Sequence, residues 1–369
     1  MPFSILGVGT AVPDASIDLA EGQMVAESLC CETEEQATFI PAIYAGTGIN
    51  RRYMCLGRAV VDDIRNDTYL SGSPFLPTRV PGERGPTTRQ RMEIYEQEAP
   101  PLAVHASANA LSQAATLPSE ITHLVTVSCT GFAAPGFDIA LINELGLSPT
   151  IHRTHVGFMG CHGALNGLRV ANAFAETSPA ARVLVCSVEL CSLHYHYGWD
   201  PPKVVANALF SDGAGAIVGG RLENPPAGTW QLVANGSHLV PEAADAMTWT
   251  IGDHGFGMTL SKRIPEVIGA RLRPWLDDWL AEQGVRVADV KSWAIHPGGP
   301  KVLDSAAGAL GLPADAVSAS REILSEYGNM SSATVLFILK RLIDRGAKGP
   351  CVAIGFGPGL NVEVALFQS

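Results

Sequence analysis

Residues 154–168 carry the sequence THVGFMGCHGALNGL, in which a short apolar run meets a glycine, then Cys161, and then a new pattern. The apolar residues after the cysteine recur at helical spacing as far as Thr177, which predicts a buried helix with Cys161 in its first turn. Unpaired N–H groups and the positive end of the helix dipole would stabilise a thiolate there, so we expect a lowered thiol pKa. A single cysteine is more often just a small buried residue, and this alternative stays open here.

The composition indicates a globular protein that does not bind nucleic acid. Of the 369 residues, 47% are hydrophobic and 17% are charged, which is enough apolar material for one large core or two fused ones. The net charge of −11 argues against nucleic acid, and any anionic substrate would need a local basic patch. The first residues lack a basic region before their apolar run, and no apolar stretch is long enough to cross a bilayer. We therefore expect neither export nor membrane insertion.

The cysteines also indicate a cytoplasmic protein. There are eight, scattered along the chain without the paired spacings of a metal site. They fit a reducing cytoplasm better than a disulfide framework.

The chain also contains a weak internal duplication. A strand pattern at 120–129 is followed by a helical pattern that closes on Gly146, and the pattern at 289–296 is followed by one that closes on Gly311. Helical patterns open again near Cys161 and near Asn329, and each precedes another strand pattern. Because the corresponding positions keep a nearly constant separation, we expect two fused βαβαβ halves with mostly parallel strands.

We place the two halves at residues 1–224 and 225–369. The joint contains two prolines and a glycine at 225–229. The first half carries a loop rich in proline, glycine and arginine at 71–87, followed by a long helical segment at 88–115. In the second half, residues 249–260 predict a hairpin, after which Pro265 starts a helix with a kink at Pro274.

The duplication brings three polar residues to one place. If the halves pack about a pseudo-twofold axis, the helix starts near Cys161 and Asn329 face each other, and His296 ends the neighbouring strand. A rigid turn at 297–300 would expose the imidazole at the carboxyl end of that strand, where open α/β sheets usually keep their chemistry. Taken singly, His296 could be a satisfied core histidine and Asn329 a helix N-cap. Together, at duplicated positions, they predict a catalytic cluster.

Four motifs resemble the chalcone synthase-like, or type III, polyketide synthases. They are Gly-Cys at 160–161, His-Pro-Gly-Gly-Pro at 296–300, Gly-Asn-Met-Ser-Ser at 328–332 and Gly-Phe-Gly-Pro-Gly-Leu at 355–360. The resemblance spans nearly the whole chain, and the last motif is particularly specific. It implies an α/β protein of the thiolase fold, with the duplicated halves in a five-layered αβαβα core, and a homodimer.

The resemblance also implies an acyltransferase that uses coenzyme A thioesters. Cys161 would hold the acyl starter as a thioester, and His296 and Asn329 would stabilise the enolate formed from malonyl-CoA. No metal or redox cofactor is implied. His194 and His196 could suggest a metal site, but without a convincing third ligand we expect them to be loop or cavity-lining residues.

Three departures from the plant enzymes concern the substrate cavity. Met258 replaces a gating phenylalanine, Ala134 replaces a methionine that reaches across the dimer, and Cys129 replaces a lining threonine. A smaller or softer lining favours a fatty acyl starter, as in the bacterial members that make alkylresorcinols or alkylpyrones. The alternative, to which we give equal weight, is that substitutions at other positions restore the size of the cavity. By resemblance, the substrate-binding residues are Phe210, Met258, Cys129, Ala134, Gly357 and Pro358.

The basic residues that hold coenzyme A are not evident. The lysines that grip its phosphates in the plant enzymes are missing at 41–46. Candidates are Arg51, Arg52, Lys262, Arg263, Arg271 and Lys301, although most basic residues simply form a solvated face.

The predicted function is therefore decarboxylative condensation of malonyl-CoA onto an acyl-CoA starter. The products would be pyrones or compounds of the resorcinol or phloroglucinol type. An initiating 3-ketoacyl-ACP synthase of the same fold is the alternative, and a catalytically silent partner subunit is the non-enzymatic one. Starter length, number of extensions and cyclisation mode depend on cavity volume, which sequence determines poorly.

Overall fold

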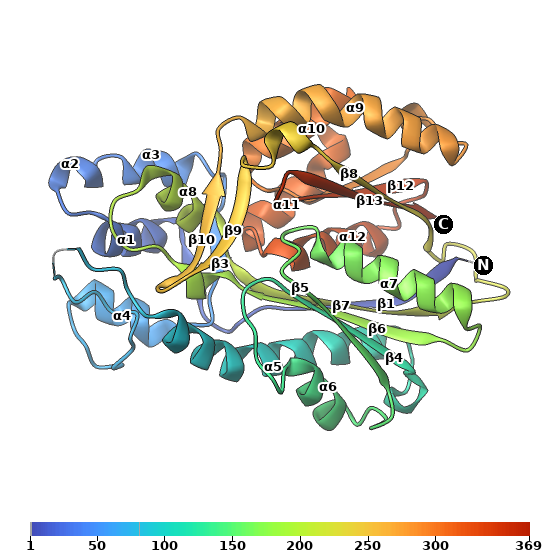
Figure 1. The fold of residues 1–369 in the computed structure, drawn as a ribbon, viewed down its shortest axis with the longest axis horizontal. Helices are drawn as coiled ribbons and strands as arrows, with labels where there is room; N and C mark the ends of the chain where they lie inside the picture. Colours follow the sequence, from blue (N-terminus) through green and yellow to red (C-terminus); the bar gives the residue numbers. More distant parts are fainter. Residues whose placement is uncertain (1, 81) are drawn as a thin grey trace.

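The structure, a computed structural model, describes residues 2–80 and 82–369 and is built on a mixed nine-stranded sheet (Figure 1). The strand order is β5-β4-β6-β7-β1 for the first half and β8-β13-β12-β11 for the second. The strands of the first part are β1 (Phe3–Ala11), β4 (His123–Ser128), β5 (His152–Gly157), β6 (Arg182–Leu190) and β7 (Asp212–Arg221). Those of the second part are β8 (Gln231–Leu239), β11 (Ser292–Ile295), β12 (Cys351–Gly357) and β13 (Asn361–Gln368).

The expectation of mostly parallel strands is wrong. Parallel pairing joins β4 to β5, β4 to β6 and β11 to β12, whereas the pairs formed by β1, β7, β8 and β13 are antiparallel. β12 and β13 are joined by a tight turn, without the helical crossover that parallel strands require. The two parts meet where Phe3 and Ser4 pair with Leu232 and Gln231. The division at residues 224 and 225 stays a prediction.

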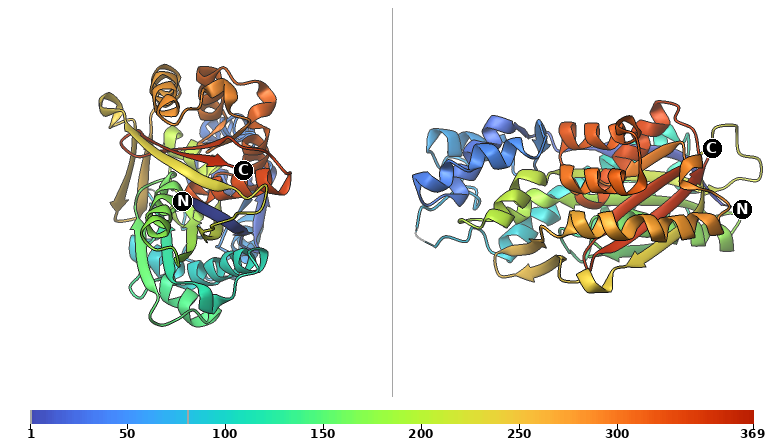
Figure 2. Two further views of the ribbon diagram at one scale, coloured as in Figure 1. Left: turned by 90° about the vertical axis from the view of Figure 1, so that its right-hand side faces the viewer. Right: turned by 90° about the horizontal axis from the view of Figure 1, so that it is seen from above.

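The helices stack with the two sheet parts into the expected five layers (Figure 2, left). Outside the first part lie α5 (Thr88–Gln113) and α6 (Phe137–Leu145). Between the parts lie α7 (Gly163–Thr177) and α12 (Thr334–Asp344). Outside the second part lie α9 (Ile264–Glu282) and α10 (Pro300–Leu310), followed in the chain by α11 (Ser318–Tyr327).

β6 shows why the central strands have continuous apolar sequences. Val183 and Val185 pack with the central helices, whereas Leu184, Cys186 and Val188 pack with the α5 side. Since successive side chains point to opposite faces, a strand covered on both faces needs apolar residues at nearly every position.

A separate helical cap adjoins one end of the sheet (Figure 2, right). It contains α1 (Leu19–Cys30), α2 (Glu34–Ala37), α3 (Ile40–Ala45), α4 (Arg58–Asn66) and α8 (Pro201–Leu209), with the short strands β2 (Ser16–Asp18) and β3 (Arg51–Tyr53). The cap has a hydrophobic cluster of its own. The predicted hairpin is confirmed as β9 (Met247–Gly252) and β10 (Gly255–Leu260).

The long helix predicted at 88–115 is confirmed as α5, and Pro265 stands in the first turn of α9 with Pro274 inside that helix. Short 3-10 helices are η1 (Pro118–Glu120), η2 (Cys191–His194), η3 (Pro241–Ala243), η4 (Val287–Asp289), η5 (Ala314–Val317) and η6 (Ser331–Ala333). Among the helices of the described residues, none has the length and apolar character needed to span a bilayer.

Candidate active site

Cys161 lies in the turn between β5 and α7. The helix begins at Gly163 with His162 as N-cap, so the cysteine precedes the first helical turn in which the sequence predicted it. Gly160 has a φ of +87°, and the Gly163 N–H donates to the Gly160 carbonyl at 2.9 Å. Cys161, which the apolar pattern assigned to the first turn of the helix, lies in this tight turn instead. The turn forms because glycine tolerates positive φ.

The expected lowering of the Cys161 pKa is also wrong. Burial is the largest influence and raises the pKa of this thiol to about 12. The Ser331 hydroxyl, which donates to Sγ at 3.6 Å, lowers it, and the nearby Glu189 carboxylate raises it. Desolvation of a thiolate outweighs the helix N-terminus here because the side chain is buried and stands outside the first turn.

His296 directly follows β11, where its N–H donates to the Ile354 carbonyl at 2.8 Å. The side chain is buried, and neither ring nitrogen has a hydrogen-bond partner within the described part of the chain. Burial, followed by the charge of His162, lowers the pKa of His296 to about 3. The imidazole is therefore neutral and has one N–H donor and one free acceptor.

Asn329 stands ahead of η6, and α12 begins only at Thr334. Its Oδ1 accepts from the Ser331 N–H at 2.9 Å, and its Nδ2 donates to the Gly298 carbonyl at 3.5 Å. Ser331 thus connects the amide to Cys161, while Gly298 belongs to the turn after His296. The structure brings Cys161, His296 and Asn329 into one buried cluster.

A cavity of about 370 Å³ opens beside this cluster. Cys161 and Ser331 contribute to its wall, whereas His296 and Asn329 are not among the lining residues found in the described chain. Of the residues predicted to bind substrate, Cys129, Phe210, Met258 and Pro358 line the cavity. Gly357 is buried behind the wall, where a Cβ would lie 2.3 Å from the His162 ring. Ala134 is exposed and is not among the lining residues found in the described chain.

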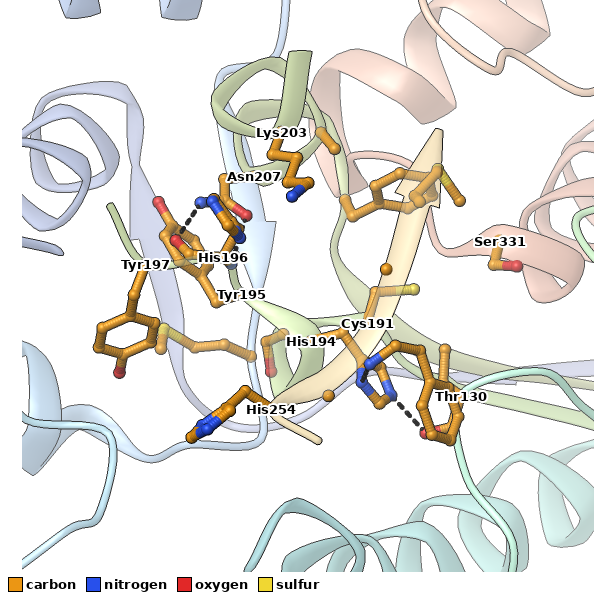
Figure 3. Close-up of a pocket in the computed structure, with 18 of the residues that line it drawn as sticks. Thr130, Cys191, His194, Tyr195, His196, Tyr197, Lys203, Asn207, His254 and Ser331 are labelled. Atoms are coloured by element: carbon orange, nitrogen blue, oxygen red, sulfur yellow. Dashed lines mark hydrogen bonds between the residues drawn. The ribbon is translucent and has the colours of Figure 1, made fainter. Parts of the chain in front are cut away.

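His194 and His196 line the cavity, which confirms that expectation (Figure 3). The Thr130 carbonyl lies 2.7 Å from His194 Nε2, and the Phe256 N–H donates to Nδ1 at 3.0 Å. A carbonyl only accepts, so Nε2 carries the proton and the ring is neutral. Burial lowers the pKa of His194 to about 3. Across residues 2–80 and 82–369, no three His, Cys, Asp or Glu side chains form a group that could hold a metal ion.

Glu189 is a buried acid that the sequence reasoning missed. It accepts from the Cys129 N–H at 3.0 Å and from the Thr130 hydroxyl at 2.8 Å, and the Ser332 hydroxyl also donates to it. Burial raises the pKa of Glu189 to about 7. An acid within the apolar strand run 183–190 was the available signal, since buried carboxylates are rare unless partnered.

The basic residues at the cavity also differ from most of the predicted candidates. Arg52 lines the cavity and is buried, and its Nη1 donates to the Asn207 and Phe210 carbonyls. The other candidates, which are exposed and outside the cavity, are Arg51, Lys262, Arg263, Arg271 and Lys301. Exposed lining residues such as Arg84, Thr250 and Asp253 mark the cavity mouth, and Lys203 lines the same cavity. Sequence reasoning missed Arg84 and Lys203, which lie far apart in the chain.

Comparison with known proteins reveals similarity along nearly the whole chain. Residues 2–222 match the N-terminal domain of chalcone and stilbene synthases, and residues 231–369 match the C-terminal domain. The chain is 35% identical over 289 residues to the "Alpha-pyrone synthesis polyketide synthase-like Pks18" of Mycobacterium tuberculosis, which covers 76% of this chain and 74% of the relative.

Solved structures with the same fold include PKS-I from the brown alga Ectocarpus siliculosus. It has a TM-score of 0.91 and 31% identity, covering 100% of this chain and 98% of that one. The C-terminal type III polyketide synthase domain of Steely1 from Dictyostelium has a TM-score of 0.86 and 25% identity, covering 100% of this chain and 99% of that one.

Proposed function

Because the chain belongs to the chalcone and stilbene synthase family of type III polyketide synthases, we propose that it extends an acyl-CoA starter by decarboxylative condensation with malonyl-CoA. It is an acyltransferase-type enzyme, and Cys161 is the proposed nucleophile. The observation that carries this proposal is the position of Cys161 in the cavity wall, linked through Ser331 to Asn329 and the His296 turn.

In the acylation step, the Cys161 sulfur attacks the thioester carbonyl of the starter. The neutral His296 imidazole takes the thiol proton as the new C–S bond forms, and it returns that proton to the departing coenzyme A thiolate. Burial favours this route because it disfavours both a free thiolate and a lasting imidazolium in the empty site. The product of the step is an acyl thioester on Cys161 and free coenzyme A.

In the condensation step, His296 and Asn329 donate hydrogen bonds to the thioester oxygen of malonyl-CoA. When carbon dioxide is lost, the electron pair of the broken C–C bond stays on the thioester and forms an enolate. The two hydrogen-bond donors stabilise the negative charge of this enolate in a buried site. The enolate carbon attacks the acyl–Cys161 carbonyl, a C–C bond forms as the C–S bond breaks, and the released Cys161 thiolate takes a proton from solvent water. The chain is then two carbons longer and attached to coenzyme A.

The proposed products are pyrones or compounds of the resorcinol or phloroglucinol type, made from a fatty acyl starter. The similarity to a protein named for alpha-pyrone synthesis supports the pyrone class. The flexible Met258 and the small Cys129 in the cavity wall support an extended acyl group. No cofactor beyond the coenzyme A substrates enters this proposal, and the reducing cytoplasm suits the free thiols of all eight cysteines.

The enzyme is proposed to work as a homodimer. β5 is the last strand in the sheet order, and its outer edge has no strand partner within the described chain. Near its carboxyl end, Phe132 and Met159 are 42% and 39% exposed, and Phe132 packs against Phe158. An unpaired edge with exposed apolar side chains is a surface that a second copy would cover.

Product analysis tests the function directly. Purified protein receives malonyl-CoA and starters from acetyl-CoA to palmitoyl-CoA, and products are identified by mass spectrometry. We expect pyrones or resorcinols that Cys161→Ala abolishes, whereas Cys31→Ala, a free thiol in the cap outside the cavity, leaves them unchanged. Asn329→Ala should still accept the starter on Cys161 but lose about 10²–10³ in turnover, the usual effect of removing one oxyanion donor. Product that appears only with acyl carrier protein would instead assign an initiating 3-ketoacyl-ACP synthase.

A further inference from the structure

His162 is a buried titratable residue that takes no part in the acylation and condensation steps. It directly follows Cys161, is 2% exposed and is the N-cap of α7. Its side chain lies against the glycines of β12: a Cβ at Gly355 would lie 2.8 Å from the His162 Cβ, and one at Gly357 would lie 2.3 Å from the ring. The His296 N–H is bonded to the same strand, at the residue before Gly355. His162 therefore adjoins both the proposed nucleophile and the proposed base.

Hydrogen bonds connect the His162 ring to the surface of the molecule. His162, Asn166 and Arg169 share one face of α7 because they are spaced by about one helical turn. His162 Nδ1 lies 2.7 Å from Asn166 Oδ1. On β13, Asn361 places its Nδ2 3.4 Å from His162 Nε2 and donates to Glu363 Oε1 at 3.0 Å. The buried Glu363 pairs with Arg169, whose side chain is 41% exposed. We call these five residues the His162 network.

The two amide partners determine which nitrogen of the His162 ring carries the proton. Asn166 Oδ1 can only accept, so Nδ1 of His162 is protonated, and Nε2 is then free to accept from the Asn361 amide. A second proton on Nε2 would face the N–H of that amide. The Asn361 side chain would have to turn over to accept it, and its bond to Glu363 would be lost. The network therefore stabilises a neutral His162 ring.

The charged groups that act on His162 come from the elements packed around it. They are Glu363 on β13, Arg169 on α7 and, when it is protonated, His296 after β11. Burial is the largest influence and lowers the pKa of His162; the hydrogen bond to Asn166 and the Glu363 carboxylate raise it, and the Arg169 guanidinium lowers it. After burial itself, the charge of His162 lowers the pKa of His296. A protonated His162 thus makes His296 a poorer proton acceptor, because like charges repel strongly in a buried site.

We propose that His162 is a positioning residue for acylation, which packs the Cys161 turn against β12 and, when protonated, opposes uptake of the thiol proton by His296. The inference rests on the proposed function and adds regulation by pH to it: acylation runs at full rate only while the His162 ring is neutral. Below the pKa of His162, the added positive charge should slow acylation about tenfold or more. Glu363 and Arg169 set the pH of this change in opposite directions.

The experiment removes these two outer charges one at a time. Arg169→Gln, Glu363→Gln and the control Arg321→Gln are each made in the wild type and in a His162→Gln background. Arg321 is a matched arginine, 43% exposed, in an ion pair on the outer helices. Acylation by dodecanoyl-CoA is followed by rapid quenching and intact-protein mass spectrometry from about pH 5 to about pH 9, the range in which histidine titrates. Circular dichroism reports whether each variant is folded.

We expect opposite effects of the two substitutions at about pH 5.5. Arg169→Gln should be acylated several-fold more slowly than the wild type, and Glu363→Gln several-fold faster, because they raise and lower the pKa of His162 respectively. At about pH 8 the ring is neutral, and all three single variants should match the wild type. In the His162→Gln background both differences should vanish, since no titrating ring remains there, whereas purely structural effects of the two substitutions would persist.

The proposal is overturned if Arg169→Gln and Glu363→Gln keep the wild-type profile, or if their differences persist without His162. If His162→Gln itself does not fold, the opposite shifts of the two single variants decide, with Arg321→Gln as reference. Each of these results leaves the polyketide synthase activity in place. Wild-type protein that no starter from acetyl-CoA to palmitoyl-CoA acylates would instead overturn the proposed function.

Discussion

Burial acts on the pKa values of Cys161 and His296 in opposite directions, and this determines the resting state of the site. The thiol pKa is raised to about 12 and the imidazole pKa is lowered to about 3, so both groups are neutral at physiological pH. A neutral pair avoids the cost of two buried charges, and proton transfer is needed only when a thioester carbonyl receives the sulfur. The Cys161 thiol therefore stays protonated, and so weakly nucleophilic, until a substrate is bound.

The pH dependence of Cys161 alkylation tests this description. With a pKa of about 12, the rate of reaction with iodoacetamide should keep rising beyond pH 10, because the thiolate is the reactive form. Glu189→Gln removes a negative charge that raises this pKa, so the curve should shift to lower pH. The shift should vanish below about pH 7, where Glu189 is itself protonated.

The alkylated cysteine is identified by peptide mass spectrometry, because all eight cysteines are free thiols. Glu176→Gln on the exposed side of α7 is the control and should leave the curve in place. A wild-type curve that levels off near neutral pH would contradict the neutral thiol.

Among the elements, the turn between β12 and β13 packs against the residues that flank the proposed nucleophile, Cys161. Pro358 packs against Gly160, so closely that a Cβ on this glycine would lie 2.1 Å from the proline Cδ. Gly355 and Gly357 leave the space that the His162 side chain occupies. The specific C-terminal motif is thus explained by close packing against the residues on either side of Cys161.

Gly160→Ala should disturb both stability and activity. The new methyl group meets Pro358, and the φ of +87° is unfavourable for alanine. We expect a loss of about 2–5 kcal/mol in the free energy of unfolding, from strain and overpacking together. Gly269→Ala is the control, because that glycine lies inside α9 with open space around it and should gain up to about 1 kcal/mol. Denaturant titration measures both values, and equal stability of the two variants would refute the explanation.

Two basic side chains, Arg84 at the cavity mouth and Lys203 in the cavity wall, are proposed to attract an anionic coenzyme A ester. Arg84 comes from the loop before α5, and Lys203 from the first turn of α8, where it pairs with Asp200 at 3.1 Å. Arg84→Ala and Lys203→Ala should each raise KM for acyl-CoA several-fold with little change in kcat, since they remove attraction for the phosphates and touch no reacting atom. Arg89→Ala, an exposed residue outside the cavity, is the matched control. Unchanged KM values at low salt would exclude both residues from coenzyme A binding.

At the scale of the whole molecule, sequence reasoning succeeded where the pattern was repeated. The family resemblance implied the five layers, and the paired positions predicted that the segments bearing Cys161, His296 and Asn329 meet. It did not predict antiparallel neighbours such as β12 and β13, because a run of apolar residues does not reveal the direction in which a strand runs in the sheet. It also missed the apolar residues of the helical cap that line the cavity, because Val25, Val61 and Phe75 contact the cavity only after separate segments fold together. The sign of the Cys161 pKa shift depends on burial in the folded protein, which a local motif does not contain.

The exposed edge of β5 has a consequence for the assembly. If a second copy covers it, size-exclusion chromatography with light scattering should give twice the 38.9 kDa chain mass for the wild type. Met159→Lys places a charge among the exposed apolar side chains beside this edge and should shift the protein toward the monomer, because burying an unpaired charge is costly. Leu70→Lys changes an equally apolar residue that is 90% exposed in the loop after α4, and it should leave the mass unchanged. A monomeric wild type, or equal effects of the two substitutions, would show that this edge is not the dimer interface.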